Sequence, residues 1–164
     1  QALLKGEKMD FVVQKAVELG AAALYPVMTE HVVVRYDAKK AAAKAARWQK
    51  IADEAAKQCG RRMLMRVAPI VSLTELLRDP AYIGAADTAT VFCYEQEERQ
   101  SMRTVLRRVT LIVGAEGGFS PAEAAAVTAA GGQPVSLGHR ILRAETASLT
   151  ALAVTQYELG NLDV

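Results

Sequence analysis

Two junctions of the same design lie near the C-terminal end of the 164-residue chain and constrain its fold more than any other feature. Each consists of a short apolar run, a turn with little side-chain bulk and the start of a helix. The first covers residues 111–123 (LIVGAEGGFSPAE) and the second residues 137–147 (LGHRILRAETA). In an α/β sheet, ligands bind outside the carboxyl ends of strands, where such turns lie. The pair predicts one ligand site built largely from backbone, which favours an enzyme.

The first junction has the signals of a strand, a tight turn and a capped helix. Residues 111–113 form a continuous aliphatic run, typical of a strand buried on both faces. Three glycines in the turn allow a ligand to approach the main chain closely: Gly114, Gly117 and Gly118. Ser120 as N-cap, Pro121 at the first helical position and Glu123 closing a capping box predict a helix that stops at residues 131–132.

Two common nucleotide-binding loops do not fit this turn. A phosphate-binding P-loop needs a lysine and then serine or threonine after its glycines, where this chain has Phe119. The dinucleotide pattern Gly-x-Gly-x-x-Gly is also absent from residues 114–118. Glu116, inside the turn, would repel a phosphate. A neutral or cationic ligand therefore fits better than a polyphosphate.

Helical and strand-like patterns alternate along the chain. Helices are expected at residues 9–19, 38–59, 73–77, 121–130 and 145–159, and strands at residues 22–28, 31–34, 67–71, 90–94 and 111–113, with residues 103–108 leading into the last strand. This alternation predicts a single α/β domain with a mostly parallel sheet and helices on both faces. General rules of topology argue against a knotted chain.

Composition limits the class of protein without identifying it. The net charge of +2 is too small to indicate a nucleic-acid-binding protein by itself, and 51% hydrophobic residues are ordinary for a globular domain. Cys59 and Cys93 lack a metal-binding spacing and are expected to be buried. There is no signal peptide and no apolar stretch of membrane-spanning length. We therefore expect a cytoplasmic protein with neither a metal nor a membrane partner.

The two junctions closely resemble the C-terminal motifs of the RsmE family, which belongs to the SPOUT superfamily. These enzymes use S-adenosylmethionine to methylate the N3 atom of a uridine in 16S small-subunit ribosomal RNA. Three earlier segments also look like family signatures in the expected order: residues 5–10 (KGEKMD), 14–20 (QKAVELG) and 47–61 (RWQKIADEAAKQCGR). The chain departs from the family pattern at Ala115, where proline is usual, and at Ala144, where threonine is usual.

The resemblance implies properties that composition and periodicity cannot show. It implies a SPOUT-type α/β knot, a C-terminal trefoil that forms the cofactor pocket, and a homodimer acting on 16S ribosomal RNA or the small ribosomal subunit. Family members carry a further RNA-binding β domain before this region, so residues 1–164 are interpreted as the methyltransferase domain, with that β domain absent from the chain. A non-catalytic RNA-binding or assembly module of the same fold, and a SPOUT methyltransferase for transfer RNA, remain alternative interpretations.

The resemblance places the cofactor, S-adenosyl-L-methionine, in both turns. The cofactor-binding candidates are Gly114, Glu116, Gly117, Gly118, Leu137, Gly138, Ile141, Leu142, Arg143, Glu145, Thr146 and Ala147. Backbone groups there would read the adenine edge and the ribose, while the aliphatic side chains would enclose the apolar ring. Each aliphatic residue is equally well explained as ordinary core. On the final helix, an apolar set could contribute to the dimer contact: Leu149, Leu152, Ala153 and Leu159.

Four residues are candidates for catalysis: Arg143, Glu54, Gln58 and Arg61. The uracil N3 atom carries a proton, so a cation that stabilises the developing anion, or a base, is needed. Arg143 is the preferred cation, although a salt bridge to Glu145 or a phosphate contact explains it equally well. Glu54 and Gln58 share a helix face, and Arg61 is expected to contact RNA phosphate or to end a solvated helix. His31 and His139 are interpreted as surface residues.

Overall fold

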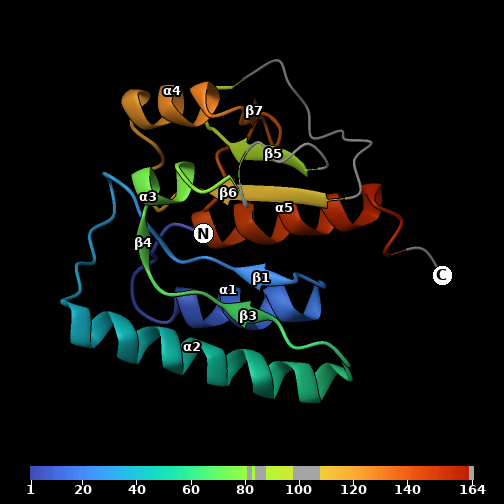
Figure 1. The fold of residues 1–164 in the computed structure, drawn as a ribbon. Helices are drawn as coiled ribbons and strands as arrows, with labels where there is room; N and C mark the ends of the chain where they lie inside the picture. Colours follow the sequence, from blue (N-terminus) through green and yellow to red (C-terminus); the bar gives the residue numbers. More distant parts are fainter. Residues whose placement is uncertain (81–82, 84–87, 98–107, 163–164) are drawn as a thin grey trace.

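A computed structural model describes residues 1–80, 83, 88–97 and 108–162 of the chain (Figure 1). The helices are α1 (Lys8–Glu18), α2 (Ala38–Cys59), α3 (Leu73–Leu77), α4 (Pro121–Ala129) and α5 (Ala144–Glu158). The strands are β1 (Ala23–Leu24), β2 (Val27–Met28), β3 (Arg66–Val67), β4 (Val71–Ser72), β5 (Thr88–Cys93), β6 (Arg108–Val113) and β7 (Gln133–Val135). The predicted lead-in at residues 103–108 lies outside the described residues, apart from its last position.

All strand pairings between these elements are parallel. β1 pairs with β3, β2 pairs with β4, and a three-stranded ladder has the order β6-β5-β7. This confirms a parallel α/β architecture, although the described strands form three separate ladders rather than one sheet. Parallel ladders need crossover helices between their strands, which is why helices and strands alternate in the sequence.

Two buried clusters divide the core between two groups of helices. One contains Val13 of α1 and Trp48 of α2, and Figure 1 shows these two helices stacked at the lower side of the molecule. The Trp48 indole Nε1 donates a hydrogen bond to Asp10 Oδ1 at 2.9 Å, which fixes α2 against α1. The other cluster contains Phe92 of β5 and Val127 of α4, on the upper side. The two turns of interest lie between these layers.

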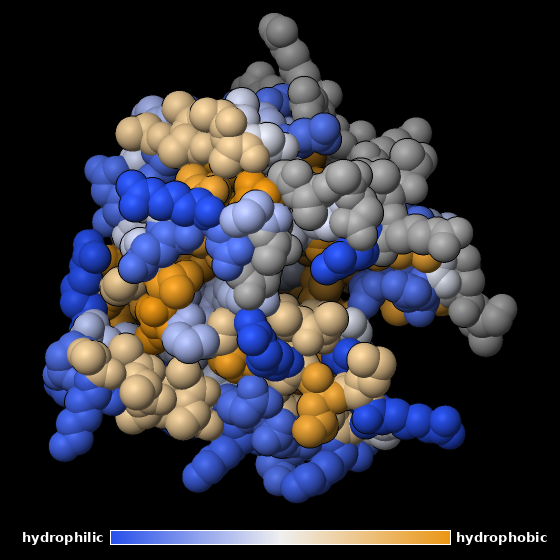
Figure 2. All heavy atoms as spheres, in the orientation of Figure 1, coloured by the Kyte–Doolittle hydropathy of each residue, from blue (hydrophilic) through white to orange (hydrophobic). Residues whose placement is uncertain are grey.

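The long helix α2 follows its prediction residue for residue. Asp37 caps it by accepting a hydrogen bond from the Lys40 amide at 2.8 Å, and Gly60 ends it in the left-handed conformation with φ of 73°. Its apolar side is buried, whereas hydrophilic side chains line the lower edge of the molecule over α2 in Figure 2. Among the described residues, no helix has both the length and the apolar character needed to cross a membrane.

Several predictions need correction. The strands expected at 22–28 and 67–71 are each divided in two around a proline, Pro26 and Pro69, which has no amide hydrogen to donate to a ladder. The strand expected at 31–34 is wrong: no strand of the described chain includes these residues, and the Val32 amide instead closes a turn onto the Thr29 carbonyl at 3.3 Å. Cys59 is exposed, contrary to expectation, because it is the last residue of α2.

Candidate cofactor site

The first junction connects β6 to α4 and has the predicted cap. Ser120 Oγ accepts a hydrogen bond from the Glu123 amide at 3.3 Å, and Glu123 Oε2 accepts one from the Ser120 amide at 3.0 Å. Phe119 is buried beneath the turn and meets Phe92 edge to face, with ring centroids 6.0 Å apart. The helix ends at Ala129, with Ala130 as its C-cap just before the predicted glycine pair. The cap of this junction is therefore built from residues close to it in sequence.

Other parts of the chain pack directly on the glycines of this first turn. A Cβ atom on Gly117 would lie 2.8 Å from His31 Cβ, and one on Gly118 would lie 1.9 Å from Glu95 Oε1. His31 Nδ1 also lies 2.6 Å from the Gly117 carbonyl oxygen, within hydrogen-bonding distance. His31 is exposed as predicted, but its contact with the turn was missed because 86 residues separate the two positions. At Gly117 glycine is thus required by His31 Cβ, whereas at Gly118 it is required by the positive φ of 66°, since the Glu95 carboxylate could move aside.

The second junction connects β7 to α5 and is more open. Gly138 has a φ of 101°, and a Cβ atom added there would meet nothing within 4 Å. Ile141 is 91% exposed. Arg143 is the N-cap of α5 in an extended conformation, and its side chain makes no capping hydrogen bond. The remaining cofactor candidates here range from partly buried to exposed: Leu137, Leu142, Glu145, Thr146 and Ala147.

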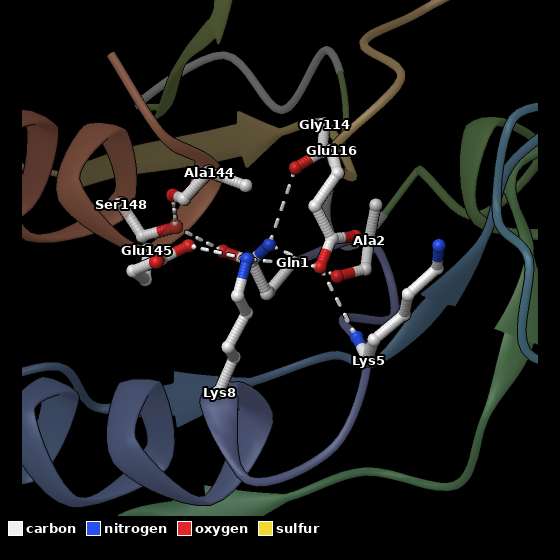
Figure 3. A network of polar contacts seen from close by, with 9 residues as sticks. All are labelled: Gln1, Ala2, Lys5, Lys8, Gly114, Glu116, Ala144, Glu145 and Ser148. Atoms are coloured by element: carbon white, nitrogen blue, oxygen red, sulfur yellow. Dashed lines mark hydrogen bonds and ion pairs between the residues drawn. The ribbon is translucent and has the colours of Figure 1, made fainter.

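Lys8, at the start of α1, brings the two turns together (Figure 3). Its Nζ atom lies 3.3 Å from Glu116 Oε1 of the first turn and 3.3 Å from Glu145 Oε2 of the second. The Glu145 Oε2 atom is buried and has no partner with hydrogen-bond geometry. The ion pair with Lys8 is thus the main interaction that offsets the cost of burying this oxygen atom. Two turns that were predicted to form one site are therefore neighbours in space.

The electrostatics of this contact follow from the same atoms. The Glu145 carboxylate, followed by Glu116, raises the pKa of Lys8 above its ordinary value. Burial acts to raise the pKa of Glu116, but hydrogen bonds from its own amide and from the Lys5 amide, together with the Lys8 ammonium, lower it overall. Both side chains are therefore charged at neutral pH. The contact is an ion pair with one more carboxylate than ammonium.

Gln1 makes a second, uncharged bridge between the two junctions. Its Nε2 atom donates a hydrogen bond to the Gly114 carbonyl at 3.4 Å, and its Oε1 atom accepts one from Ser148 Oγ at 2.5 Å (Figure 3). Ser148 lies on the first turns of α5, and its hydroxyl also contacts the Ala144 carbonyl at 2.7 Å. The first eight residues of the chain thus contact both junctions through two separate side chains.

The other predicted catalytic residues lie elsewhere in the chain. Glu54 forms an exposed ion pair with Lys57 at 2.7 Å, and Gln58 is exposed on the same helix. Arg61 Nη1 donates to the carbonyls of Val17 and Ala21 at 3.0 and 2.8 Å, next to the last turn of α1. Lys8 is at the opposite end of α1, roughly 14 Å away at about 1.5 Å per helical residue. Within one chain, the structure does not bring this group to the two turns.

A cavity of about 450 Å³ lies between α5, β6 and β1. Leu149, Leu152 and Leu159, which were predicted to contribute to a dimer contact, line this cavity. None of the predicted cofactor residues lines it. The cavity is therefore separate from the pair of turns, although Gln1 borders both.

Comparison with known proteins agrees with this arrangement. Residues 1–156 match the family described as RNA methyltransferase domain. The chain is 36% identical over 166 residues to Ribosomal RNA small subunit methyltransferase E of Bacillus subtilis. This match covers 95% of the chain and 63% of the Bacillus subtilis protein. The chain is 34% identical over 158 residues to the protein of the same name from Synechocystis, covering 93% of this chain and 50% of that one.

A solved structure shows the same fold with a ligand. The crystal structure of Ribosomal RNA small subunit methyltransferase E from Neisseria gonorrhoeae, bound to S-adenosyl methionine, matches with a TM-score of 0.83 and 36% identity. The match covers 95% of this chain and 64% of that one, so the chain spans between half and two thirds of the relatives compared. Because the family match extends over residues 1–156, the chain belongs to the RNA methyltransferase domain family.

Proposed function

We propose that this chain is the catalytic domain of an S-adenosylmethionine-dependent methyltransferase that modifies the N3 atom of a uridine in 16S small-subunit ribosomal RNA. The observation that carries the proposal is the ion-paired contact of Lys8 with both Glu116 and Glu145, since it makes one site of two turns. Relatives named as small-subunit ribosomal RNA methyltransferases support this substrate over transfer RNA. The Neisseria relative, bound to S-adenosyl methionine, supports the cofactor.

The residues present fit this cofactor. S-adenosylmethionine carries a positive sulfonium, and two carboxylates of the turns, Glu116 and Glu145, share the single Lys8 ammonium, so carboxylate oxygens are available to a cationic group. The buried Glu145 Oε2 atom lacks a hydrogen bond that a ligand could supply. The glycines of the first turn add no side-chain bulk there, although His31 already packs against Gly117. We propose the twelve predicted residues of the two turns as the set that holds the cofactor.

The cofactor supplies a methyl group attached to a positively charged sulfur. The chain must then bind the nucleotide, orient it and help its N3 atom to lose a proton. We assign to Arg143 the stabilisation of the resulting uracil anion, because its planar guanidinium can donate two parallel hydrogen bonds. Glu145 pairs with Lys8, and the described residues show no ion pair of Arg143 with it. That favours a ligand-facing role for Arg143 over a structural one.

The remaining parts of the proposal concern assembly. We include the C-terminal trefoil knot, the homodimer and a cytoplasmic location as expectations of the family. Glu54 and Gln58 lie far from the turns of their own chain, so a role at the reacting atoms requires the partner subunit of such a dimer. Arg61 already donates to two carbonyls beside the end of α1, and we assign it the positioning of that helix.

Calorimetry with S-adenosylmethionine tests the cofactor site first. The unmodified chain should release or absorb heat on binding, and Gly117→Val should lose binding because its side chain would clash with His31 and close the backbone approach. Gly60→Ala is the control, since Gly60 also requires a glycine conformation but ends α2 away from the turns. Absence of binding to the unmodified chain would overturn the proposal.

Methyl transfer to small-subunit particles or to 16S ribosomal RNA tests the reaction. Transfer of a labelled methyl group, followed by analysis of the modified nucleoside, should identify 3-methyluridine. Arg143→Ala should lower turnover by roughly 100-fold or more, the range of a lost charge-stabilising donor, and should lower cofactor affinity far less. Loss of cofactor affinity alone would assign Arg143 to donor binding. Cofactor binding without any methyl transfer would favour the non-catalytic module.

A further inference from the structure

We infer that Lys8 is a positioning residue that holds the two cofactor turns together, an inference that rests on the proposed function. Lys8 lies about a hundred residues before the first turn in sequence and was not among the predicted site residues. Its ammonium nevertheless contacts one carboxylate from each turn, both at 3.3 Å (Figure 3). Lys8 belongs to neither turn, so it joins the two turns from outside both of them.

The position of Lys8 is fixed by the helix that carries it. Lys8 is the first residue of α1, and the next turn of that helix is buried through Met9, Val12 and Val13. The Asp10 carboxylate accepts a hydrogen bond from the Trp48 indole, which anchors the same helical turn to α2. The side-chain ammonium is thus presented from a rigid element. A rigid cation can define the separation of two loops that have no direct hydrogen bond to each other among those described.

Charge explains why the turns need such a cation. Without it, the carboxylates of Glu116 and Glu145 would face each other as like charges. Glu116 would keep the hydrogen bond from the Lys5 amide, at 3.3 Å. The buried Glu145 Oε2 atom would have no cationic partner in the described part of the chain. Loss of Lys8 should therefore displace the second turn more than the first.

The uncharged bridge through Gln1 separates this role from that of a general structural residue. Gln1 joins the Gly114 carbonyl to Ser148 without using Lys8. The two junctions therefore stay attached when the ion pair is removed, and the domain should still fold. What changes is the geometry of the carboxylates. The effect of Lys8 is expected in cofactor affinity rather than in thermal stability.

Three substitutions test this inference by calorimetry with S-adenosylmethionine and by thermal unfolding. Lys8→Met removes the charge with little change in length, Lys8→Arg keeps the charge, and Lys15→Met is the matched control. Lys15 lies on the same helix, is 32% exposed compared with 35% for Lys8, and contacts Glu18 and the Phe11 ring of its own helix, away from the two turns. Lys8→Met should raise the Kd about fivefold, the upper end of the effect of an ion pair that is partly open to solvent. Lys8→Arg should recover most of that loss, and Lys15→Met should bind like the unmodified chain.

A double-mutant cycle identifies the partner. In a Glu145→Gln background, Lys8→Met should have less than half of its effect on the Kd, because the pair is already broken. An unchanged Kd for Lys8→Met would overturn the inference while leaving the proposed function intact. An equal loss for Lys8→Met and Lys8→Arg, or a full Lys8→Met effect in the Glu145→Gln background, would also overturn it. Failure of the unmodified chain to bind would instead count against the proposed function.

Discussion

The two strand–turn–helix junctions look alike in sequence but are held in different ways. The first is fixed locally, by a reciprocal capping box between Ser120 and Glu123 and by Phe119 buried beneath it. The second has an exposed Ile141 and an N-cap, Arg143, whose side chain makes no capping bond. The first eight residues of the chain contact both junctions, through Gln1 and Lys8, so the junctions differ in their local cap and not in these long-range contacts.

This difference separates two tasks that a ligand site must perform. A locally fixed turn presents backbone groups in one arrangement whether or not a ligand is bound, which lowers the entropic cost of binding. An open turn held from outside leaves room for side chains to meet a substrate. We therefore expect the first junction to determine cofactor recognition, and the second to respond to changes in the N-terminal segment.

The largest expected effect on stability distinguishes crowding by a neighbour from strain within the backbone. Gly117→Ala should cost about 1–3 kcal/mol of stability because its Cβ would lie 2.8 Å from His31 Cβ. Gly138→Ala, in open space with a φ of 101°, should cost a similar amount from backbone strain alone. His31→Gly should therefore relieve Gly117→Ala and leave Gly138→Ala unchanged.

Double-mutant cycles from urea unfolding give the two coupling free energies. His31 and Gly117 are in direct contact, so we expect coupling of about 1 kcal/mol or more. His31 and Gly138 should be additive within about 0.5 kcal/mol. Coupling of His31 with Gly138 as strong as that with Gly117 would show that the two turns do not differ in the proposed way.

Local signals made part of this fold predictable. The bounds of α2 and α3 and the cap of α4 follow from residues within a few positions of each helix end, such as Asp37, Gly60 and Ser120. The strand at residues 111–113 is a continuous aliphatic run, which is the pattern of a buried parallel strand. The error at residues 31–34 has a physical cause, since a run of valines forms a strand only where a partner strand is available.

The long-range contacts of the site were not predictable in the same way. Lys8 and His31 contact the first turn from positions more than 80 residues away, and nothing in their local sequence indicates it. For Arg61 the local sequence was misleading. Its position at a helix end suggested an RNA contact, whereas its guanidinium donates hydrogen bonds to carbonyls beside the end of α1. A turn can be recognised from its glycines, but the residues that surround it depend on how the whole chain packs.

The smallest expected effect on stability tests the comparison at the two N-caps. Ser120→Ala should lower the free energy of unfolding by about 1 kcal/mol, because the Glu123 amide loses its acceptor in the capping box. Arg143→Ala should change it by less than about 0.5 kcal/mol, because an exposed side chain without a capping bond contributes little to folding. Ser72→Ala is a matched cap control, since Ser72 and Glu75 form the same reciprocal pair at α3.

If Arg143→Ala destabilised the chain as much as Ser120→Ala in urea unfolding, the second junction would be locally fixed as well. The low stability cost is also what separates Arg143 as a reacting-site cation from a residue that merely builds the turn, because only the former leaves the fold intact while turnover falls.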